Sequence, residues 1–366
     1  MRMHKTIQII PPAARGLAKI AVSAWVVLLA AQAVASESLT RAAAPAAELW
    51  QPVAAASSAS GAKRLQIAAL RQTVRLNQVA LANLLQQAPM EFTEAARVAP
   101  SVITLPMPDG SFARFTFEEA PIMAPGLAQL YPEIKTYRGR GIDDPTATVR
   151  FDAMPSGFHA MVLASSGTVL IDPQIGAVDS AVGSAVIASH LLDYTSYYKH
   201  DTIRPSEPFT CSVGGEVGND SLKRRADHLS TESAGKHVNV AAISGVTLRT
   251  YRLAVAATNE YAVAAGGNTV AGTLAAQVLV MNRVNGIYER DIAVRMIIVN
   301  NNNLLLYAGD NVTCGGACTA ANDPYTNNDS DAMLVENQAK IDAVIGNANY
   351  DIGHVFSTGG DRKSVV

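Results

Sequence analysis

The sequence predicts an α+β chain in two parts: a helix and a β-rich unit, followed by a three-layer α/β unit with a mostly parallel sheet. Short extended runs between glycine and proline turns fill residues 101–173, and apolar runs alternate with helical patterns after residue 246. A polar, non-periodic stretch, residues 205–237, separates the two parts. With 366 residues, 49% of them hydrophobic, the chain has room for two ordinary cores. The net charge of -2 gives no broad attraction for nucleic acid, so we predict no nucleic-acid partner.

The N-terminus has the features of a signal peptide. Basic residues precede the apolar run Ile20–Ala35, which ends in the small-x-small pattern Ala33-Val34-Ala35. This run is shorter than the roughly 20 residues that span a bilayer. We predict a signal peptide over residues 1–35, with an uncleaved membrane anchor as the alternative. The mature protein is expected to be secreted and extracellular, without a membrane partner after signal cleavage.

Residues 36–100 are predicted to form a linker and a helix. Ser36–Gly61 is rich in Ala, Ser and Pro, a composition typical of linkers. Over Ala62–Gln87 the apolar residues recur at helical spacing, and Pro89 ends the pattern.

Residues 101–204 are predicted to form a β-rich unit. Pro108-Asp109-Gly110 lies between two extended runs, which indicates a hairpin turn. The unit has no cluster of His, Cys or carboxylate side chains, so we predict no chemistry in it.

Residues 205–240 are predicted to form a flexible linker. It contains the basic triplet Lys223-Arg224-Arg225, which a trypsin-like or dibasic-cutting protease could reach in a flexible segment. The alternative is a solvated run of charges.

Residues 241–360 alternate strand and helix patterns, an order that predicts parallel strands joined by right-handed crossovers. Ile292–Val299 is almost wholly apolar, as a strand covered on both faces should be. A second helix is expected from about Asp331 to Ile345, with Asp329 or Ser330 as its N-cap. The other expected elements are a strand over 247–258, a helix over 268–291 and a strand over 350–356.

Several segments of this part have distinctive sequences: NNNNLLLYAGD, DPYTNN and ENQAKIDAVIGNANYDIGHVFSTGG. They resemble the first half of the reprolysin-like (M12B-type) catalytic domain of bacterial secreted zinc metallopeptidases, in the metzincin group. LPMPDGSFARFTFEEAPIMAP and YTSYYKHD resemble the pro-segment of that family. The resemblance covers Ser101–Gly360. It implies a zymogen with an incomplete metzincin catalytic domain over 241–360, Zn²⁺ as the cofactor of the full-length protein, and a protein or peptide substrate.

The zinc site that the resemblance implies is missing from the sequence. Metzincins bind zinc through H-E-x-x-H-x-x-G-x-x-H, in which two histidines lie one helical turn apart and the glutamate is the base for the zinc-bound water. This sequence has 7 histidines, and the nearest two, His228 and His237, are nine positions apart. We therefore predict no catalytic and no metal-ligating residue, and no peptidase activity from the chain as written. His354 is expected to be a structural histidine with its hydrogen bonds satisfied.

Residues 361–366 do not resemble the continuation of the family after Gly360. They back-translate naturally into the start of a widely used sequencing adapter. We expect a foreign tail here and a gene that runs on; a genuine frameshift or pseudogene is the alternative.

The sequence has 3 cysteines, Cys211, Cys314 and Cys318. In an exported chain the close pair predicts a Cys314–Cys318 disulfide, with two free thiols as the alternative. Cys211 is a candidate latency thiol, because a pro-segment thiolate can occupy the open position on a metzincin zinc. An unpaired structural cysteine and an intermolecular disulfide are the alternatives for Cys211.

The Asp/Asn-rich stretch Asp310–Asp331 lacks the spacing of a calcium loop, so we expect a turn-rich connection and no calcium site there.

For the whole chain we expect the precursor fragment of an exported zinc metalloendopeptidase. The main alternative is a non-enzymatic secreted binding or inhibitory module derived from the pro-domain, and a cell-surface adhesin is a weaker one.

Overall fold

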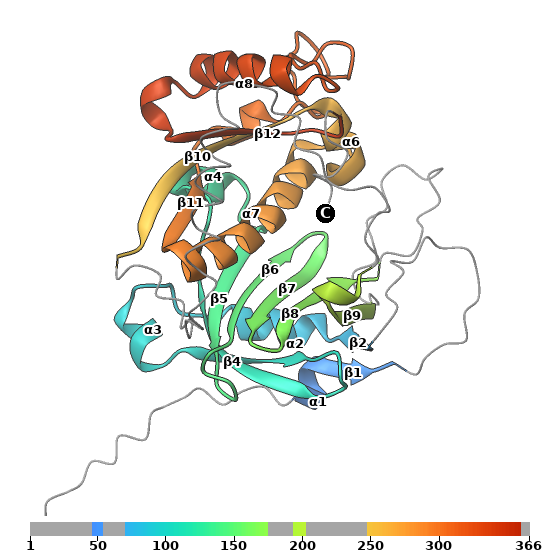
Figure 1. The fold of residues 1–366 in the computed structure, drawn as a ribbon, viewed down its shortest axis with the longest axis vertical. Helices are drawn as coiled ribbons and strands as arrows, with labels where there is room; N and C mark the ends of the chain where they lie inside the picture. The colour runs from blue at the N-terminus through green and yellow to red at the C-terminus, as the bar shows by residue number, and fades with distance from the viewer. Residues whose placement is uncertain (1–45, 54–69, 175–192, 203–246, 360–366) are drawn as a thin grey trace, which may run out of the picture. The chain divides into compact units, whose positions relative to one another are not determined.

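Most of the described strands belong to one antiparallel sheet of nine strands, in the order β1-β2-β9-β8-β7-β6-β5-β4-β3 (Figure 1). The computed structural model describes residues 46–53, 70–174, 193–202 and 247–359, all within the unit Ser38–Val366. The strands of this antiparallel sheet are β1 (Trp50–Pro52), β2 (Arg71–Leu76), β3 (Ser101–Pro106), β4 (Phe112–Glu119), β5 (Lys135–Gly141), β6 (Thr148–Met154), β7 (Gly157–Ala164), β8 (Gly167–Pro173) and β9 (Asp193–Tyr198).

The antiparallel sheet nearly closes into a barrel around an aromatic core. Its two outer strands, β1 and β3, meet where the indole Nε1 of Trp50 donates a hydrogen bond to the Thr104 carbonyl over 2.7 Å. The largest side chains buried inside are Trp50, Phe115, Phe117, Phe151, Phe158 and Tyr194. The short helices of this part are α1 (Ala46–Leu49), α2 (Gln78–Leu85), α3 (Glu94–Val98) and α4 (Pro125–Leu130), and the 3-10 helix η2 is Lys199–Asp201.

A second, smaller sheet follows, with three parallel strands in the order β11-β10-β12. Helix α7 packs on β11 and helix α8 on β12. The elements of this part are β10 (Arg249–Ala257), α6 (Asn259–Gly266), α7 (Val270–Ile292), β11 (Val294–Ile298), η3 (Asn302–Leu305), α8 (Ser330–Val344), η4 (Asn347–Asn349) and β12 (Ile352–Phe356).

The predicted fold class is therefore wrong for the chain. The expectation was a small β-rich unit and a mostly parallel, three-layer α/β domain, whereas the nine-stranded antiparallel sheet dominates and parallel pairing is limited to three strands. The reason is physical: the sequence shows short extended runs over residues 101–173, but it does not show which strands pair, because strand pairing is non-local. The pairing of β2 with β9, for example, joins Val74 to Tyr194.

The helix predicted over 62–87 is also wrong over the residues that the structure describes there. Residues 71–76 form β2, and only Gln78–Leu85 is helical. Pairing with β1 on one side and β9 on the other satisfies the β2 backbone, and this tertiary pairing outweighs a local helical pattern. The side chain of Asn77 then accepts a hydrogen bond from the Ala80 backbone and starts α2.

Two local predictions are confirmed. Gly110 has a φ of 90° in the turn between β3 and β4, and the Asp109 carboxylate accepts the Ser111 N–H at 3.0 Å. Asp329 is the N-cap of α8, because its side chain accepts the N–H groups of Asp331 and Ala332.

Other predictions fall on residues outside the described ranges, among them the signal peptide over 1–35, the linker over 205–240 and the tail over 361–366. Among the described helices, none is by itself long and apolar enough to cross a bilayer. Helices α6 and α7 meet that test only when taken together, as a pair bent by 79°.

Candidate functional site at the ends of the parallel strands

Polar residues follow the carboxyl ends of β10 and β12, which are neighbours in the parallel sheet. Thr258 and Asn259 come directly after β10, while Ser357 and Thr358 follow β12. The Thr258 N–H donates to the Phe356 carbonyl over 3.0 Å, so the two strand ends lie side by side. In open α/β sheets ligands bind outside the carboxyl ends of the strands, so a functional site is expected at this edge.

Asn327, from the Asp/Asn-rich loop, ties the two strand ends together. Its side-chain oxygen accepts hydrogen bonds from the Thr258 hydroxyl and from the Thr358 N–H, both over 3.1 Å. Its amide nitrogen donates to the Thr358 hydroxyl over 3.2 Å. A Cβ on Gly359 would lie 1.9 Å from the Asn327 carbonyl oxygen, so only glycine fits there.

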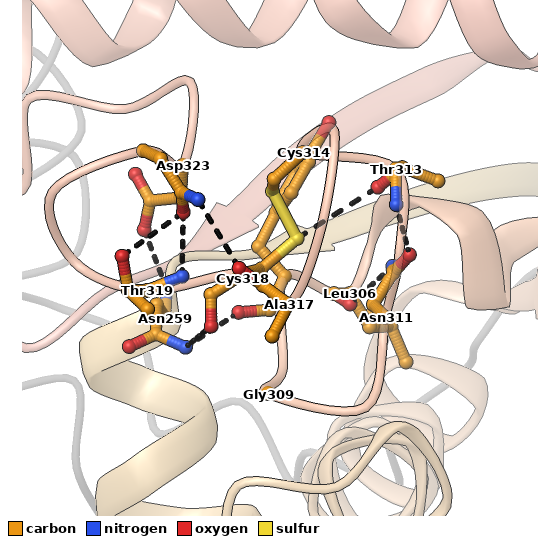
Figure 2. The surroundings of a disulfide bond; sticks show 12 residues. Asn259, Leu306, Gly309, Asn311, Thr313, Cys314, Ala317, Cys318, Thr319 and Asp323 are labelled. Carbon is orange, nitrogen blue, oxygen red and sulfur yellow. Dashed lines mark hydrogen bonds between the residues drawn. A yellow bond between two sulfur atoms is a disulfide. The ribbon is translucent and has the colours of Figure 1, made fainter.

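Asn259 binds the same Asp/Asn-rich loop, at Cys318 and Asp323, as Figure 2 shows. Its side-chain amide is buried and donates to the carbonyls of Tyr307 and Cys318, over 2.8 Å and 3.1 Å. Its backbone N–H donates to Asp323 over 2.7 Å. Burial raises the pKa of Asp323, although the backbone N–H groups that it accepts act in the opposite direction.

Cys314 and Cys318 form a disulfide with a Cα–Cα distance of 5.3 Å (Figure 2). Gly315 has a φ of 80°, which the tight turn between the cysteines requires. Cys318 is 1% exposed and packs in the core between α8 and the parallel sheet. Next to it, the Asn311 amide donates to the Leu306 carbonyl over 2.6 Å. The loop is thus anchored by a covalent link and by side-chain hydrogen bonds.

Removing this disulfide is expected to lower the free energy of unfolding by about 2 kcal/mol, because it closes only a short loop and so restrains the unfolded chain little. Urea unfolding of Cys314→Ser/Cys318→Ala against the parent chain measures the loss. Val312→Ala is the control, since Val312 lies in the same loop and is 75% exposed. An equal, negligible loss in both variants would show that the bridge does not restrain the fold.

The aspartates of this loop cap helices. The carboxylate of Asp310 accepts the N–H of the first residue of α7 over 2.7 Å, and Asp323 does the same for α6. Asp329 caps α8. An anionic group at a helix N-terminus is stabilised by the helix dipole and by the free N–H groups. These oxygens therefore serve backbone donors.

The residues that the structure describes do not fit a zinc ion. Among them there is no group of three His, Cys, Asp or Glu side chains that could hold a metal. His159 in β7 lies 2.9 Å from the Asp152 carboxylate, His200 in η2 stacks on Tyr198, and His354 is in β12. His354 is exposed and its ring contacts the Phe356 ring, and its role as a structural histidine with satisfied hydrogen bonds stays a prediction.

The parallel sheet, its helices and the Asp/Asn-rich loop lie within a match to a known family. Residues 247–365 match the model described as Metallo-peptidase family M12B Reprolysin-like. No curated protein matches the chain. The match relates this part of the chain to metallopeptidases of a family that is generally zinc-dependent. The antiparallel sheet lies outside the matched residues.

The predicted site residues have different outcomes. Cys314 and Cys318 are brought together. Cys211 and the triplet Lys223, Arg224 and Arg225 lie outside the described residues, so the latency thiol and the cleavage site remain predictions.

Sequence reasoning missed the two asparagines that organise this edge, Asn259 and Asn327. A signal for Asn259 was present, because Thr258-Asn259 directly follows an apolar strand, where polar residues gather in parallel sheets. Asn327 lies among many similar residues in its loop, and its position gave no such signal.

Proposed function

We propose that the chain is part of the precursor of an exported zinc-dependent metalloendopeptidase. The pro-segment would precede about residue 241, the first half of the catalytic domain would follow it, and proteins or peptides would be the substrate. The observation that carries this proposal is the match of residues 247–365 to the reprolysin-like M12B family. The proposal keeps the secretory signal at 1–35, Cys211 as the latency thiol and Lys223–Arg225 as the cleavage site.

In this proposal the described residues supply the scaffold of the peptidase. Strands β10, β11 and β12 and helices α6 to α8 form one sheet with packed helices, and the disulfide loop fixes the ends of two of the strands. The sequence contains no H-E-x-x-H motif, and the described residues do not fit zinc. The chain by itself is therefore expected to lack peptidase activity.

Adding Zn²⁺ to the purified chain is expected to produce no hydrolysis of a quenched fluorescent protein substrate above a blank without protein. The physical reason is that neither a chelating histidine pair nor the general base is encoded in the sequence. Hydrolysis that appears with zinc and disappears with a chelator would contradict the proposed inactivity.

The peptidase assignment itself is tested on the gene. Genomic sequencing through the codon for Gly360 and beyond should show an in-frame H-E-x-x-H motif. A locus without that motif would leave the family relationship without the peptidase function.

A second function is favoured by one observation. The antiparallel sheet has its own aromatic core and lies outside the family match, as a separate binding or inhibitory module would. In that case the chain should bind and inhibit an active metallopeptidase supplied separately, in a titration with a fixed amount of enzyme. Absence of inhibition would leave the first proposal.

A further inference from the structure

Apolar side chains from the two halves of the described chain pack into a single cluster. The N-terminal module is here residues 46–53, 70–174 and 193–202, and the C-terminal module is residues 247–359. The N-terminal module contributes the buried residues Ile122, Met123, Leu127, Ile134 and Met154. The C-terminal module contributes residues of the parallel sheet and of α7, among them Leu253, Leu274, Val278, Met281, Met296 and Ile298. Such a shared core opposes relative motion of two domains.

A short segment of the N-terminal module pairs with the outer edge of β11. The Ile298 N–H donates to the Ile122 carbonyl over 2.8 Å, and the Ala124 N–H donates to the Ile298 carbonyl over 2.7 Å. These two bonds place Met123 opposite Ile298 in a parallel bridge. The unpaired groups of an edge strand invite association with other chains, and this segment satisfies the N–H and carbonyl of Ile298 on that edge.

The start of α4 is held by Asn300, which lies two residues after the end of β11. The side-chain oxygen of Asn300 accepts the Leu127 N–H over 3.1 Å. A Cβ on Gly126 would lie 2.8 Å from that same oxygen, so a larger residue there would displace the Asn300 side chain. The backbone of one module and a side chain of the other are therefore fitted to each other.

A continuous chain of ion pairs crosses between the modules. Its members alternate in sign in the order Glu118, Arg138, Glu91, Arg295, Glu289, Arg150. The Glu118–Arg138 and Glu91–Arg295 distances are each 2.6 Å. The side chains of Arg150 and Arg295 are only 3% exposed. Buried charges of this kind require their partners, so each module supplies counterions that the other needs.

The backbone hydrogen bonds between the two modules lie at the β11 edge of the parallel sheet. In the order β11-β10-β12, the N-terminal segment pairs with β11, and the edge of β12 is at the opposite end. Helix α7 makes further contacts, through Asn282, which donates to the Phe151 carbonyl, and through Arg283, which pairs with Asp172. The hydrogen bonds and ion pairs described above therefore join the N-terminal module to β11, to Asn300 and to α7.

We infer that the N-terminal module is a lasting partner of the C-terminal module, which stays bound along β11 and α7 after the chain between them is cut. In this arrangement it pairs with Ile298 at the edge of β11 and supplies the counterions of Arg295 and Glu289. The inference rests on contacts alone, so it stands or falls independently of the proposed peptidase function.

The first test uses the full chain with a specific protease recognition sequence in place of Lys223, Arg224 and Arg225, which lie between the modules. After complete cleavage, both fragments are expected to elute together in size-exclusion chromatography under native conditions, and to separate in urea. Separate elution in native buffer would overturn the inference.

The second test removes one edge hydrogen bond. Ala124 has φ -60° and ψ 150°, a conformation that proline adopts without strain. Ala124→Pro removes the N–H that donates to the Ile298 carbonyl. The Kd of the cut complex should then be at least about tenfold higher than that of the parent. Ala124→Ser keeps the N–H and serves as the matched control. Equal Kd values for the two variants would show that the β11 edge does not hold the modules together.

A charge exchange decides the question if Ala124→Pro does not fold. Arg283→Asp places two carboxylates together across the modules, so the cut complex should separate at a lower urea concentration. Asp172→Arg in the same chain should restore the pairing, and with it most of the resistance to urea. A single variant as resistant as the parent, or a double variant without recovery, would argue against the interface.

Discussion

Replacing Glu289 with alanine is expected to lower the free energy of unfolding by about 3–5 kcal/mol. The Glu289 carboxylate accepts hydrogen bonds from both Arg150 and Arg295, whose side chains are each 3% exposed. Without it, among the described residues Arg150 would keep a 3.4 Å hydrogen bond to the side-chain oxygen of Asn282, and its charge would stay buried without a carboxylate from this part of the chain. Urea unfolding followed by far-ultraviolet circular dichroism measures the loss.

The matched control for this variant is Glu94→Ala. Glu94 pairs with Arg97 at an exposed site, where the two side chains are 70% and 74% exposed. Exposed pairs contribute about 0–1 kcal/mol, so the control should differ little from the parent. If Glu289→Ala were no more costly than Glu94→Ala, the ion-pair chain would be a surface feature and not a buried one.

The pH dependence gives a second reading of the same carboxylate. Burial raises the pKa of Glu289, but the guanidinium groups of Arg150 and Arg295 outweigh burial and leave it below the ordinary value of 4.5. Because the folded pKa is depressed, the stabilisation is fully present above the unfolded value and is lost as the pH falls through the folded one. The stability difference between the parent chain and Glu289→Gln should therefore shrink on acidification below about pH 4.5. A difference that stays constant down to pH 3 or so would contradict this linkage.

Local signals in the sequence predicted local structure well. Asp109-Gly110 specified its turn, and Asp329 specified the start of α8, because in both cases the deciding hydrogen bond lies within three residues. The same reasoning failed at residues 71–76, where the deciding partners are Trp50–Pro52 and Asp193–Tyr197, far away along the chain. Periodicity alone could not reveal those partners.

The charged interface was missed for a related reason. Glu91, Arg150 and Glu289 lie in separate segments, and in the sequence each resembles an ordinary solvated charge. Only the packing of α7 on β6 brings Glu289 to Arg150. The outcome was different for the disulfide, whose cysteines are separated by only 4 positions, so their proximity required no knowledge of the fold.

Replacing Trp50 with alanine is expected to lower the free energy of unfolding by about 3–5 kcal/mol. Trp50 falls in the segment that its composition assigned to a linker, yet its side chain is 1% exposed. Its ring packs edge-on against Phe158 and Tyr194, with centroid distances of 5.8 Å and 5.9 Å. The alanine variant would lose this packing and leave a cavity where the antiparallel sheet closes.

Two further variants separate volume from hydrogen bonding at this position. Trp50→Phe keeps most of the apolar contact but leaves the Thr104 carbonyl without the indole N–H, a loss of about 1–3 kcal/mol. Val79→Ala, at a side chain that is 70% exposed on α2, should change the stability by no more than about 0.5 kcal/mol. The loss in free energy of unfolding is expected to be largest for Trp50→Ala, smaller for Trp50→Phe and smallest for Val79→Ala. Equal, small losses for all three would mean that β1 does not close the antiparallel sheet, and that the composition-based linker is the better description of this segment.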